Sequence, residues 1–439
     1  MRSDFLVEKI FSGVNPDSLL DNYGKVTQVH GYFIEATNQN AKVGEITKVK
    51  NRGEDLECEV VSISNDTVLL APLKMPSGIG VGDKVWYSGA QAKVKHLSEP
   101  FGRILNGLGE DISTKKLNES NEHIILTTET PALSQRSSVD TIALTSIKVI
   151  DHLLPIGKGQ KLGVFSGSGV GKSTLLNNMH HAMHADVKII AMIGERSREV
   201  IEFYDNFINS NQSKDTFIVA STSDESPMMK HRALNVALSY AKAFCDQGKH
   251  VLLTVDSITR LAHALREVGI SRGELPIVRG YPPSVFTELS KIVEMCGNFV
   301  NGGSITGLMS VLVDGDDEHE PVSDYMRGIL DGHLFLERKL SDIGLYPSID
   351  ILKSRSRVSE RIFSNESKII AKQIKFAYSR YADIEDVVKT GIYTRGTNAE
   401  IDATIKIKSR LDKELYSSGR TLSKSLISDI KNYAKSYSD

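Results

Sequence analysis

The sequence of 439 residues contains few cysteines, no long apolar run and little net charge. Its three cysteines, Cys58, Cys245 and Cys296, lie far apart, which indicates buried thiols in a reducing compartment rather than a disulfide framework or a metal site. No apolar run approaches the roughly 18 residues that a membrane-spanning helix requires. Since 53 lysines and arginines face 55 aspartates and glutamates, no global positive charge points to a nucleic-acid partner. We therefore expect a cytoplasmic protein.

The residues that are present fall into three zones, and the chain is long enough for two or three domains. Short β-type segments, separated by Gly and Asn turns, fill residues 1–96 and predict a small β-barrel after a short N-terminal extension. Apolar runs alternate with helical segments over residues 97–358, which predicts a parallel sheet covered on both faces. Residues 359–439 predict a helical domain. The expected fold class is therefore α/β, with barrel, sheet and helices in that order.

Apolar patterns locate the main elements of the last two zones. The runs predicted as buried strands lie at residues 161–165, 187–193, 216–222, 250–256 and 304–313. One C-terminal stripe at helical spacing consists of Ile370, Ile374, Ala377, Tyr381, Ile384 and Val388, and a second consists of Leu422, Leu426, Ile430 and Tyr433. These stripes can pack the helical domain on its neighbour, or they can bind a partner.

One glycine-rich stretch, FSGSGVGKST at residues 165–174, follows a predicted strand and precedes a predicted helix. Backbone N–H groups can solvate a phosphate chain only where no side chains intervene, and glycine clears that space. The following helix adds the positive end of its dipole, the lysine reaches the β- and γ-phosphates, and the next hydroxyl can bind Mg²⁺. The residues assigned to the nucleotide are Gly167, Ser168, Gly169, Val170, Gly171, Lys172, Ser173 and Thr174.

This stretch departs from the phosphate-loop pattern at one position. Ser166 stands where the pattern has glycine, and we expect so small a side chain to be tolerated. The alternative is an accidental Gly/Ser turn, which the preceding strand and the following helix disfavour.

Two carboxylates follow other predicted strands, at the edge of the sheet where open α/β folds bind ligands. Asp256 ends the run at 250–256 and is suited to hold Mg²⁺ through water, although it can instead cap the next helix. Glu195 follows the run at 187–193 and can deprotonate the water that attacks the γ-phosphate. Its alternative role is a surface salt bridge with Arg196 or Arg198.

The ordered motifs of the chain resemble those of the ATPases of type III secretion, relatives of the catalytic subunits of rotary proton-ATPases. The similarity runs from about Gly31 to the end and is strongest between residues 160 and 360. The motifs are GSGVGKSTLL, IGERSREV, VDSITRLAHALREVG, GYPPSVFTELSKIVE, GSITGLMSVLVDGDD, RGILDGH and YPSIDILKSRSRV. The resemblance implies a central RecA-like ATPase domain, an N-terminal barrel that serves oligomerisation, and the cofactors ATP and Mg²⁺.

The resemblance also implies roles at the phosphates. Lys172 and Ser173 match the pair that binds phosphate and Mg²⁺, and Asp256 matches the acidic end of the second nucleotide-binding motif. Glu195 matches the glutamate that activates water. Two arginines match neighbours of the nucleotide, namely Arg196 and Arg260.

Further residues match positions that lie farther from the phosphates. Tyr346 matches the aromatic residue that packs on adenine, and Tyr393 is a second candidate for the same pocket. Arg357 matches the arginine finger given to the nucleotide of a neighbouring subunit, and Arg355 is a nearby rival. A monomer would lack the arginine that a neighbouring subunit gives to its site. The resemblance therefore implies assembly, and in this family the assembly is a homohexamer.

Family members energise flagellar export or virulence injectisomes at the cytoplasmic face of the inner membrane, where they associate peripherally with an export gate. The implied partners are stator and stalk proteins, secretion chaperones and the export substrates, which the enzyme helps to release and unfold. A short amphipathic helix in DFLVEKIF, residues 4–11, can bind the stator, or this end can be frayed. Ser197 stands where the family more often has glycine, and we expect hydrolysis to survive this departure.

Two other classes of function share part of the pattern. The element DSITRLA also occurs in RNA-stimulated hexameric helicases of the transcription-terminator type, but no basic run with interleaved aromatics supports nucleic-acid binding here. A rotary ATPase subunit that binds nucleotide without hydrolysis is disfavoured by Glu195, since such subunits usually lack that carboxylate. Flagellar export and injectisome secretion both stay open, with a slight preference for flagellar export.

Overall fold

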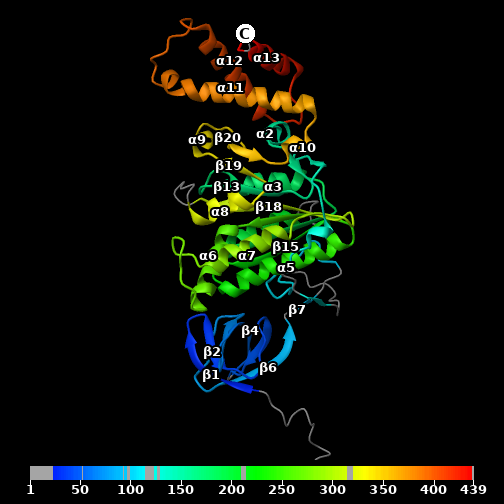
Figure 1. Ribbon diagram of the computed structural model, residues 1–439, viewed down its shortest axis with the longest axis vertical. Helices are drawn as coiled ribbons and strands as arrows, with labels where there is room; N and C mark the ends of the chain where they lie inside the picture. Colours follow the sequence, from blue (N-terminus) through cyan, green and yellow to red (C-terminus); the bar gives the residue numbers. More distant parts are fainter. Residues whose placement is uncertain are drawn as a thin grey trace, which may run out of the picture.

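The computed structural model describes residues 23–51, 53–91, 93–95, 99–113, 123–125, 129–208, 214–313 and 320–437. Barrel, central sheet and C-terminal helices follow one another along the long axis of the molecule (Figure 1). The helix predicted over residues 4–11 lies outside the described residues. Among the helices that are described, none combines the length and apolar content needed to cross a bilayer.

The predicted N-terminal barrel is confirmed. Its strands close in the order β1-β2-β5-β4-β3-β6, and every neighbouring pair is antiparallel. Alternate side chains such as Val26, Ile34 and Leu70 fill the interior, as expected where one face of a closed sheet is buried. The strands are β1 (Tyr23–His30), β2 (Phe33–Thr37), β3 (Glu45–Val49), β4 (Leu56–Ile63), β5 (Thr67–Pro72) and β6 (Lys84–Gln91).

The central sheet runs in the order β20-β19-β13-β18-β16-β14-β15-β8, and all neighbours are parallel except β19 and β20. The five strands predicted from apolar runs are confirmed, with ends that agree within two residues. The strands are β8 (Ile104–Leu105), β13 (Lys161–Ser166), β14 (Val187–Glu195), β15 (Thr216–Thr222), β16 (His250–Asp256), β18 (Ser304–Leu312), β19 (Gly332–Leu336) and β20 (Ile349–Ser356).

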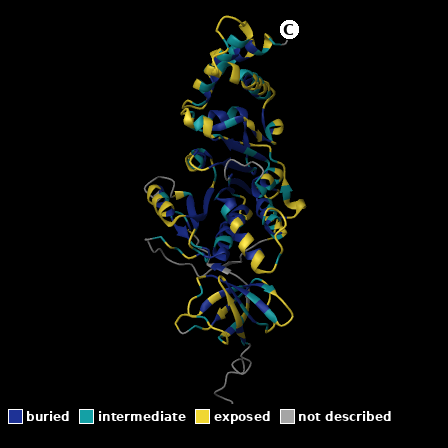
Figure 2. Cartoon of the chain, turned by 90° about the vertical axis from the view of Figure 1, so that its left-hand side faces the viewer, coloured by how far each residue is buried: buried dark blue, intermediate teal, exposed yellow. Residues whose placement is uncertain are grey.

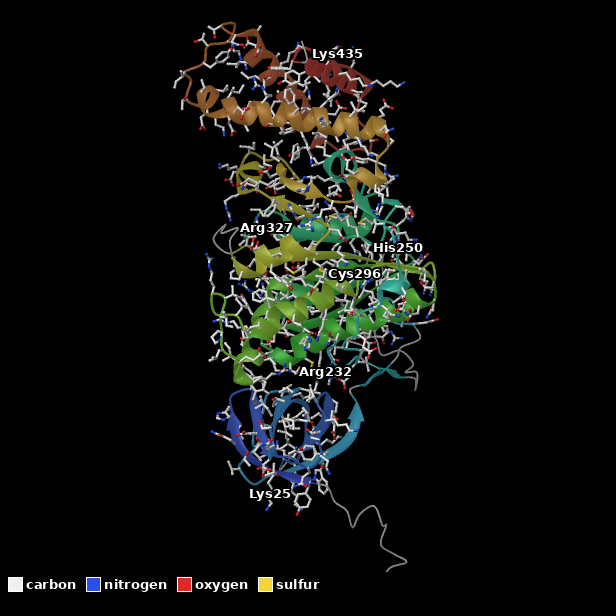
Figure 3. The ribbon with its side chains drawn as sticks, in the orientation of Figure 1. Lys25, Arg232, His250, Cys296, Arg327 and Lys435 are labelled. Carbon is white, nitrogen blue, oxygen red and sulfur yellow. The ribbon has the colours of Figure 1, made fainter. Side chains whose placement is uncertain are left out.

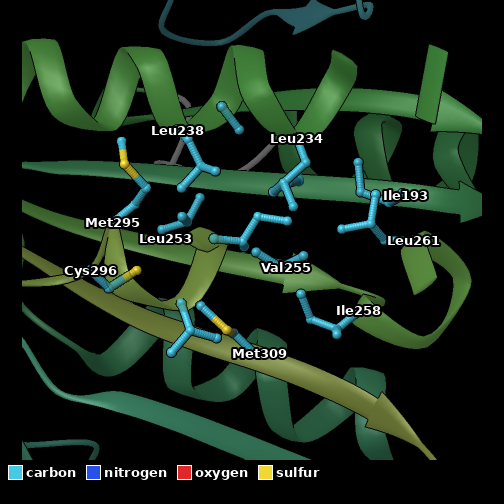
Figure 4. Packing of buried hydrophobic residues seen from close by; sticks show 14 of the residues in the cluster. Ile193, Leu234, Leu238, Leu253, Val255, Ile258, Leu261, Met295, Cys296 and Met309 are labelled. Atoms are coloured by element: carbon cyan, nitrogen blue, oxygen red, sulfur yellow. The ribbon is translucent and has the colours of Figure 1, made fainter. Parts of the chain in front are cut away.

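Helices cover both faces of this sheet. Figure 4 shows Leu234 and Leu238 of α5 and Leu261 of α6 packed against strands of one face. On the other face α3 and the C-terminal helices pack on a second apolar cluster, and Figure 2 shows buried residues concentrated in the strands between the helices. The helices are α3 (Lys172–Ala182), α4 (Ser197–Ile208), α5 (Pro227–Asp246), α6 (Ile258–Ser271), α7 (Pro283–Glu294) and α8 (Pro321–Ile329).

The C-terminal helices pack on the sheet through α2 and β20. In the first predicted stripe Ile374 and Ala377 are fully buried, whereas Tyr381, Ile384 and Val388 are half-buried toward the end of the long helix α11. The residues of the second stripe are all buried. These helices are α11 (Asn365–Lys389), α12 (Ala399–Leu415) and α13 (Lys424–Lys435).

The three cysteines are buried thiols, as predicted.

Short elements connect the barrel, the sheet and the C-terminal helices. The short elements are β7 (Lys93–Lys95), β9 (His123–Ile125), η2 (Leu133–Gln135), β10 (Arg136–Ser137), β11 (Ile142–Ala143), α2 (Lys148–Leu153), β12 (Ile156–Gly157), β17 (Gly297–Phe299), α9 (Arg338–Asp342) and α10 (Ser359–Ile362).

An ion pair between a buried arginine and a half-buried glutamate joins the barrel to the central domain. Arg232 of α5 is 3% exposed and contacts the carboxylate of Glu59 in β4 at 2.9 Å. Figure 3 shows Arg232 where the central domain meets the barrel. Around this pair, side chains of both parts form one apolar cluster that includes Phe33, Leu73 and Met229. The barrel is therefore packed on the helix layer rather than tethered by a linker alone.

Candidate active site

The glycine-rich stretch forms a turn between β13 and α3, as its sequence context predicts. β13 ends at Ser166, and α3 begins at Lys172 with Gly171 as its N-cap. Gly169 and Gly171 have φ values of +79° and +94°, a left-handed region that glycine adopts without strain. The loop therefore ends at the N-terminus of a helix, an arrangement that favours phosphate binding.

Two side chains from distant segments brace this loop. The Ser348 hydroxyl donates to the carbonyl of Val170 at 2.7 Å, and the Arg338 guanidinium donates to the carbonyl of Ser168 at 3.0 Å. Both contacts use carbonyl groups, so they do not compete with an anion for the N–H groups of the loop. Neither residue is among those predicted for the site from the sequence, although Ser348 belongs to the motif YPSIDILKSRSRV.

Lys172, Asp256 and Ser310 meet at the carboxyl end of the sheet. The Lys172 ammonium lies 2.5 Å from Asp256 Oδ1, and the Ser310 hydroxyl donates to the same oxygen at 2.6 Å. Asp256 does not cap the next helix, because the Ser257 side chain takes that position and accepts from the N–H of Arg260. The alternative structural role for Asp256 is therefore wrong.

Glu195 is 6% exposed and contacts the guanidinium of Arg260 at 3.1 Å. Arg260 also donates to the carbonyl of Gly194 at 2.6 Å. Burial is the largest cause of a raised pKa, and the nearby Asp256 charge raises it further, whereas Arg260 and Lys172 oppose the rise. The pKa of Glu195 is about 7, which suits a general base at neutral pH.

The two arginines that follow Glu195 contact other carboxylates. Arg196, just before α4, lies 3.9 Å from Glu199, and Arg198 lies 3.1 Å from Glu202; all four residues are exposed. The expected alternative, a surface salt bridge between Glu195 and one of these arginines, is therefore not formed. Glu195 pairs instead with Arg260, which comes from a distant part of the sequence. The same guanidinium donates to the carbonyl of Gly194, a residue 66 positions away.

Two cavities flank the start of α3. One of about 360 Å³ is lined by Ser173, Glu195 and Asp256 among others, so the expected metal-binding and water-activating groups share one space. The Ser173 hydroxyl and the Asp256 carboxylate are oxygen donors that line this cavity. Such donors fit Mg²⁺, which is commonly held by one or two protein ligands together with substrate phosphates and waters.

The second cavity, of about 440 Å³, lies between the phosphate loop and Tyr346, and Thr174 also lines it. Tyr346 is 53% exposed, and its hydroxyl lies 3.0 Å from the Ser341 hydroxyl. The structure thus brings Tyr346 to the loop, on the side of α3 away from Glu195. It places Tyr393 between α11 and α12, where the Tyr393 hydroxyl donates to the carbonyl of Asn398 at 2.9 Å.

Arg357 lies at the opposite edge of the sheet from the phosphate loop. β20 runs antiparallel to β19, so its last residue, Ser356, pairs with Gly332 at the start of β19. The five residues of β19 span about 16 Å. The Arg357 guanidinium donates to the carbonyls of Arg327 and Gly328, at 3.0 and 3.3 Å. It therefore lies far from the nucleotide site of its own chain.

This edge also carries a large polar cavity of about 920 Å³. Its lining includes Arg357 together with Arg136, Lys161, Glu294 and Asp331. Arg355, the rival candidate, lies on β20 opposite His333 and is exposed. Like Arg357, Arg355 lies near the start of β19, away from the strand ends that carry the phosphate loop.

Two family models match the chain. The nucleotide-binding domain of the ATP synthase alpha/beta family matches residues 146–356, and the C-terminal domain of the EscN ATPase of type III secretion systems matches residues 363–416. The first match contains the phosphate loop, Glu195 and Asp256. The second covers the whole of α11 and α12.

Curated proteins and solved structures are similar over most of the chain. A flagellum-specific ATP synthase of Borreliella burgdorferi is 41% identical over 385 residues, which cover 87% of this chain and 88% of that protein. The protein of the same name from Helicobacter pylori is 38% identical, with 90% and 92% covered. The assembled ATPase EscN of the enteropathogenic E. coli type III secretion system has a TM-score of 0.86 at 33% identity, with 93% of this chain and 99% of that chain covered. EscN in complex with its central stalk EscO has a TM-score of 0.81.

Proposed function

Because the chain belongs to the family of type III secretion ATPases and flagellum-specific ATP synthases, and is an ATP hydrolase, we propose that it energises protein export as a homohexamer. The site residues are proposed from their geometry. Lys172 and the loop N–H groups bind the phosphates, Ser173 binds Mg²⁺ directly, and Asp256 binds it through water. Mg²⁺ supplies neutralisation of the charge on the phosphate oxygens. Tyr346 packs on the adenine.

Glu195 acts as the general base in this proposal. Its carboxylate accepts the proton of the water that attacks the γ-phosphate, and its pKa of about 7 keeps it both basic and partly ionised at neutral pH. Arg260 holds the Glu195 side chain in place through their 3.1 Å contact. Arg196 is proposed as a further neighbour of the nucleotide, which it can reach only if it leaves Glu199.

The observation that carries the oligomeric proposal is the position of Arg357. An arginine at the opposite edge of the sheet cannot act on its own nucleotide, but a head-to-tail contact between copies brings that edge to the next copy's site. Such contacts close into a ring when the rotation fits. The solved structure of assembled EscN, which shares the fold of this chain, supports the same arrangement.

The remaining parts of the proposal concern the export system. We propose stator and stalk proteins, secretion chaperones and export substrates as partners, with release and unfolding of the substrates as the work done. The enzyme would act in the cytoplasm, peripherally at the export gate on the inner membrane. The complex of EscN with its central stalk supports the stalk partner, and the identities of 38% and 41% to flagellum-specific relatives support a flagellar role. No specific nucleic acid is proposed.

Mixed rings test the proposal directly. Arg357→Ala removes the donated arginine, and Lys172→Ala destroys the chain's own phosphate site, so each variant alone should lose activity by about 10³-fold or more. In an equal mixture, about one quarter of sites combine an intact Lys172 with an intact neighbouring Arg357, so about a quarter of wild-type activity should return. A mixture that co-assembles by sizing yet stays inactive would show that Arg357 is not donated between copies.

A further inference from the structure

Ser310 contacts both charged residues of the phosphate site, although no motif or relative assigned it a role. It lies on β18, the strand between β13, which leads into the phosphate loop, and β16, which ends in Asp256. In register, Ser310 lies beside Val164 of β13. Its hydroxyl donates to Asp256 Oδ1 at 2.6 Å and accepts from Lys172 at 3.4 Å.

The burial of this hydroxyl makes the contact significant. Ser310 is fully buried in a strand whose adjacent residues, Met309 and Val311, are buried and apolar. A buried hydroxyl costs free energy unless it is hydrogen-bonded, and here its bonds go to Asp256 and Lys172. Apolar packing alone would be served better by alanine or valine at this position.

The strand around Ser310 is held on both sides of the site. The N–H of Leu312 donates to the Thr259 hydroxyl of α6 at 2.8 Å, and the N–H of Val313 donates to the carbonyl of Ser166 at 2.9 Å. The end of β18 is therefore tied both to the helix after Asp256 and to the strand before the phosphate loop. A hydroxyl on such a frame has a well-defined position, as a positioning group requires.

We propose that Ser310 is a positioning residue that orients the Asp256 carboxylate toward the water ligands of Mg²⁺. This inference rests on the proposed function, in which Lys172 turns to the phosphates of bound nucleotide and gives up its contact with Asp256. The Ser310 hydroxyl then stays as the donor to Oδ1. Because the terminal torsion of a carboxylate has only a broad preference, a fixed donor to one oxygen is needed to aim the other.

The test compares three variants of the full chain. Ser310→Ala removes the donor, Ser310→Thr keeps it, and Ser304→Ala makes the same change at a buried serine of the same strand. The Ser304 hydroxyl has no hydrogen-bond partner among the described residues, so this variant is a matched control. Two midpoints are measured against Mg²⁺ concentration, those of ATP hydrolysis and of the rise in Tm with a non-hydrolysable ATP analogue.

Ser310→Ala should raise both Mg²⁺ midpoints by about tenfold, a typical effect of removing a group that orients a metal ligand. Ser310→Thr should stay within about twofold of wild type, and Ser304→Ala should not move either midpoint. If Ser310→Thr does not fold, Ser310→Cys, which keeps the shape but donates weakly, should give midpoints close to those of the alanine variant.

Equal Mg²⁺ midpoints for Ser310→Ala and Ser304→Ala would overturn the inference. It would also be overturned if Ser310→Ala lowered Tm and kcat without moving the midpoints, since that result describes a structural residue only. Failure of the proposed function gives a different result, because wild type itself would then show no Mg²⁺-dependent hydrolysis.

Discussion

The rate of hydrolysis should depend on pH through the ionisation of Glu195. This carboxyl group is almost fully buried, lies near Asp256, and has a pKa raised to about 7. Only the ionised form can accept a proton from the attacking water. The protein should therefore gain activity as pH rises through neutrality, at a point where an ordinary glutamate is already ionised.

The size of this effect follows from the pKa. With a pKa of about 7, about one tenth of Glu195 side chains are ionised at about pH 6 and about nine tenths at about pH 8. Because kcat/KM reports ionisations of the nucleotide-free enzyme, kcat/KM should rise about tenfold between these two pH values. A glutamate with the ordinary pKa of about 4.3 would give an almost constant kcat/KM over the same range.

The assay is kcat/KM for MgATP hydrolysis, measured at nucleotide concentrations well below KM and at saturating Mg²⁺, at constant ionic strength and with the protein held in its assembled form. The residual rate of Glu195→Gln, measured over the same range, reports any ionisation of the nucleotide itself and serves as the control. A constant wild-type kcat/KM between about pH 6 and about pH 8 would refute the assignment of Glu195 as a base with a raised pKa. A profile shared by wild type and Glu195→Gln would refute it as well.

Three further predictions concern stability and binding. The pKa of Glu195 is raised in the folded chain, so the folded state binds the proton more tightly than the unfolded state does. The wild-type protein therefore loses stability as pH rises from about 4.5 to about 7. Glu195→Gln has no ionisable group at this position, so its free energy of unfolding, measured with denaturant, should gain up to about 3 kcal/mol relative to wild type over this window. A gap independent of pH would contradict this. Arg232→Ala removes a buried arginine and leaves the half-buried Glu59 carboxylate without its partner, so it should cost about 2–3 kcal/mol in the same assay. Lys48→Ala, which removes an exposed pair with Glu57, should cost less than about 1 kcal/mol; equal losses would contradict the role of burial. Tyr346→Ala should raise KM for ATP by about tenfold and Tyr346→Phe should leave it nearly unchanged, because in the proposed packing the ring face and not the hydroxyl contacts adenine. An unchanged KM in Tyr346→Ala would exclude this packing.

Much of the fold could be predicted because its signals are local. Buried parallel strands are near-continuous apolar runs, and the five runs in the central zone became five strands of the sheet. The phosphate loop was equally predictable, since strand, glycines, lysine and helix are contiguous and the backbone geometry follows from residues 165–174 alone. The apolar runs also placed Glu195 and Asp256 at the ends of strands, whereas Tyr346, which precedes β20, was assigned only from its motif.

Contacts between distant segments were decided only by the tertiary structure. The ion pair of Glu195 with Arg260, the raised pKa of Glu195 and the contact of Ser310 with Asp256 all depend on which strands are neighbours and in which register. Strand order and register arise from packing of the whole sheet, and no residue near Glu195 in the sequence specifies them. The sequence by itself therefore determined the elements and the chemistry available at their ends. The structure alone decided which of those groups meet, and it separated Arg357 from its own site because β20 runs antiparallel to its neighbour.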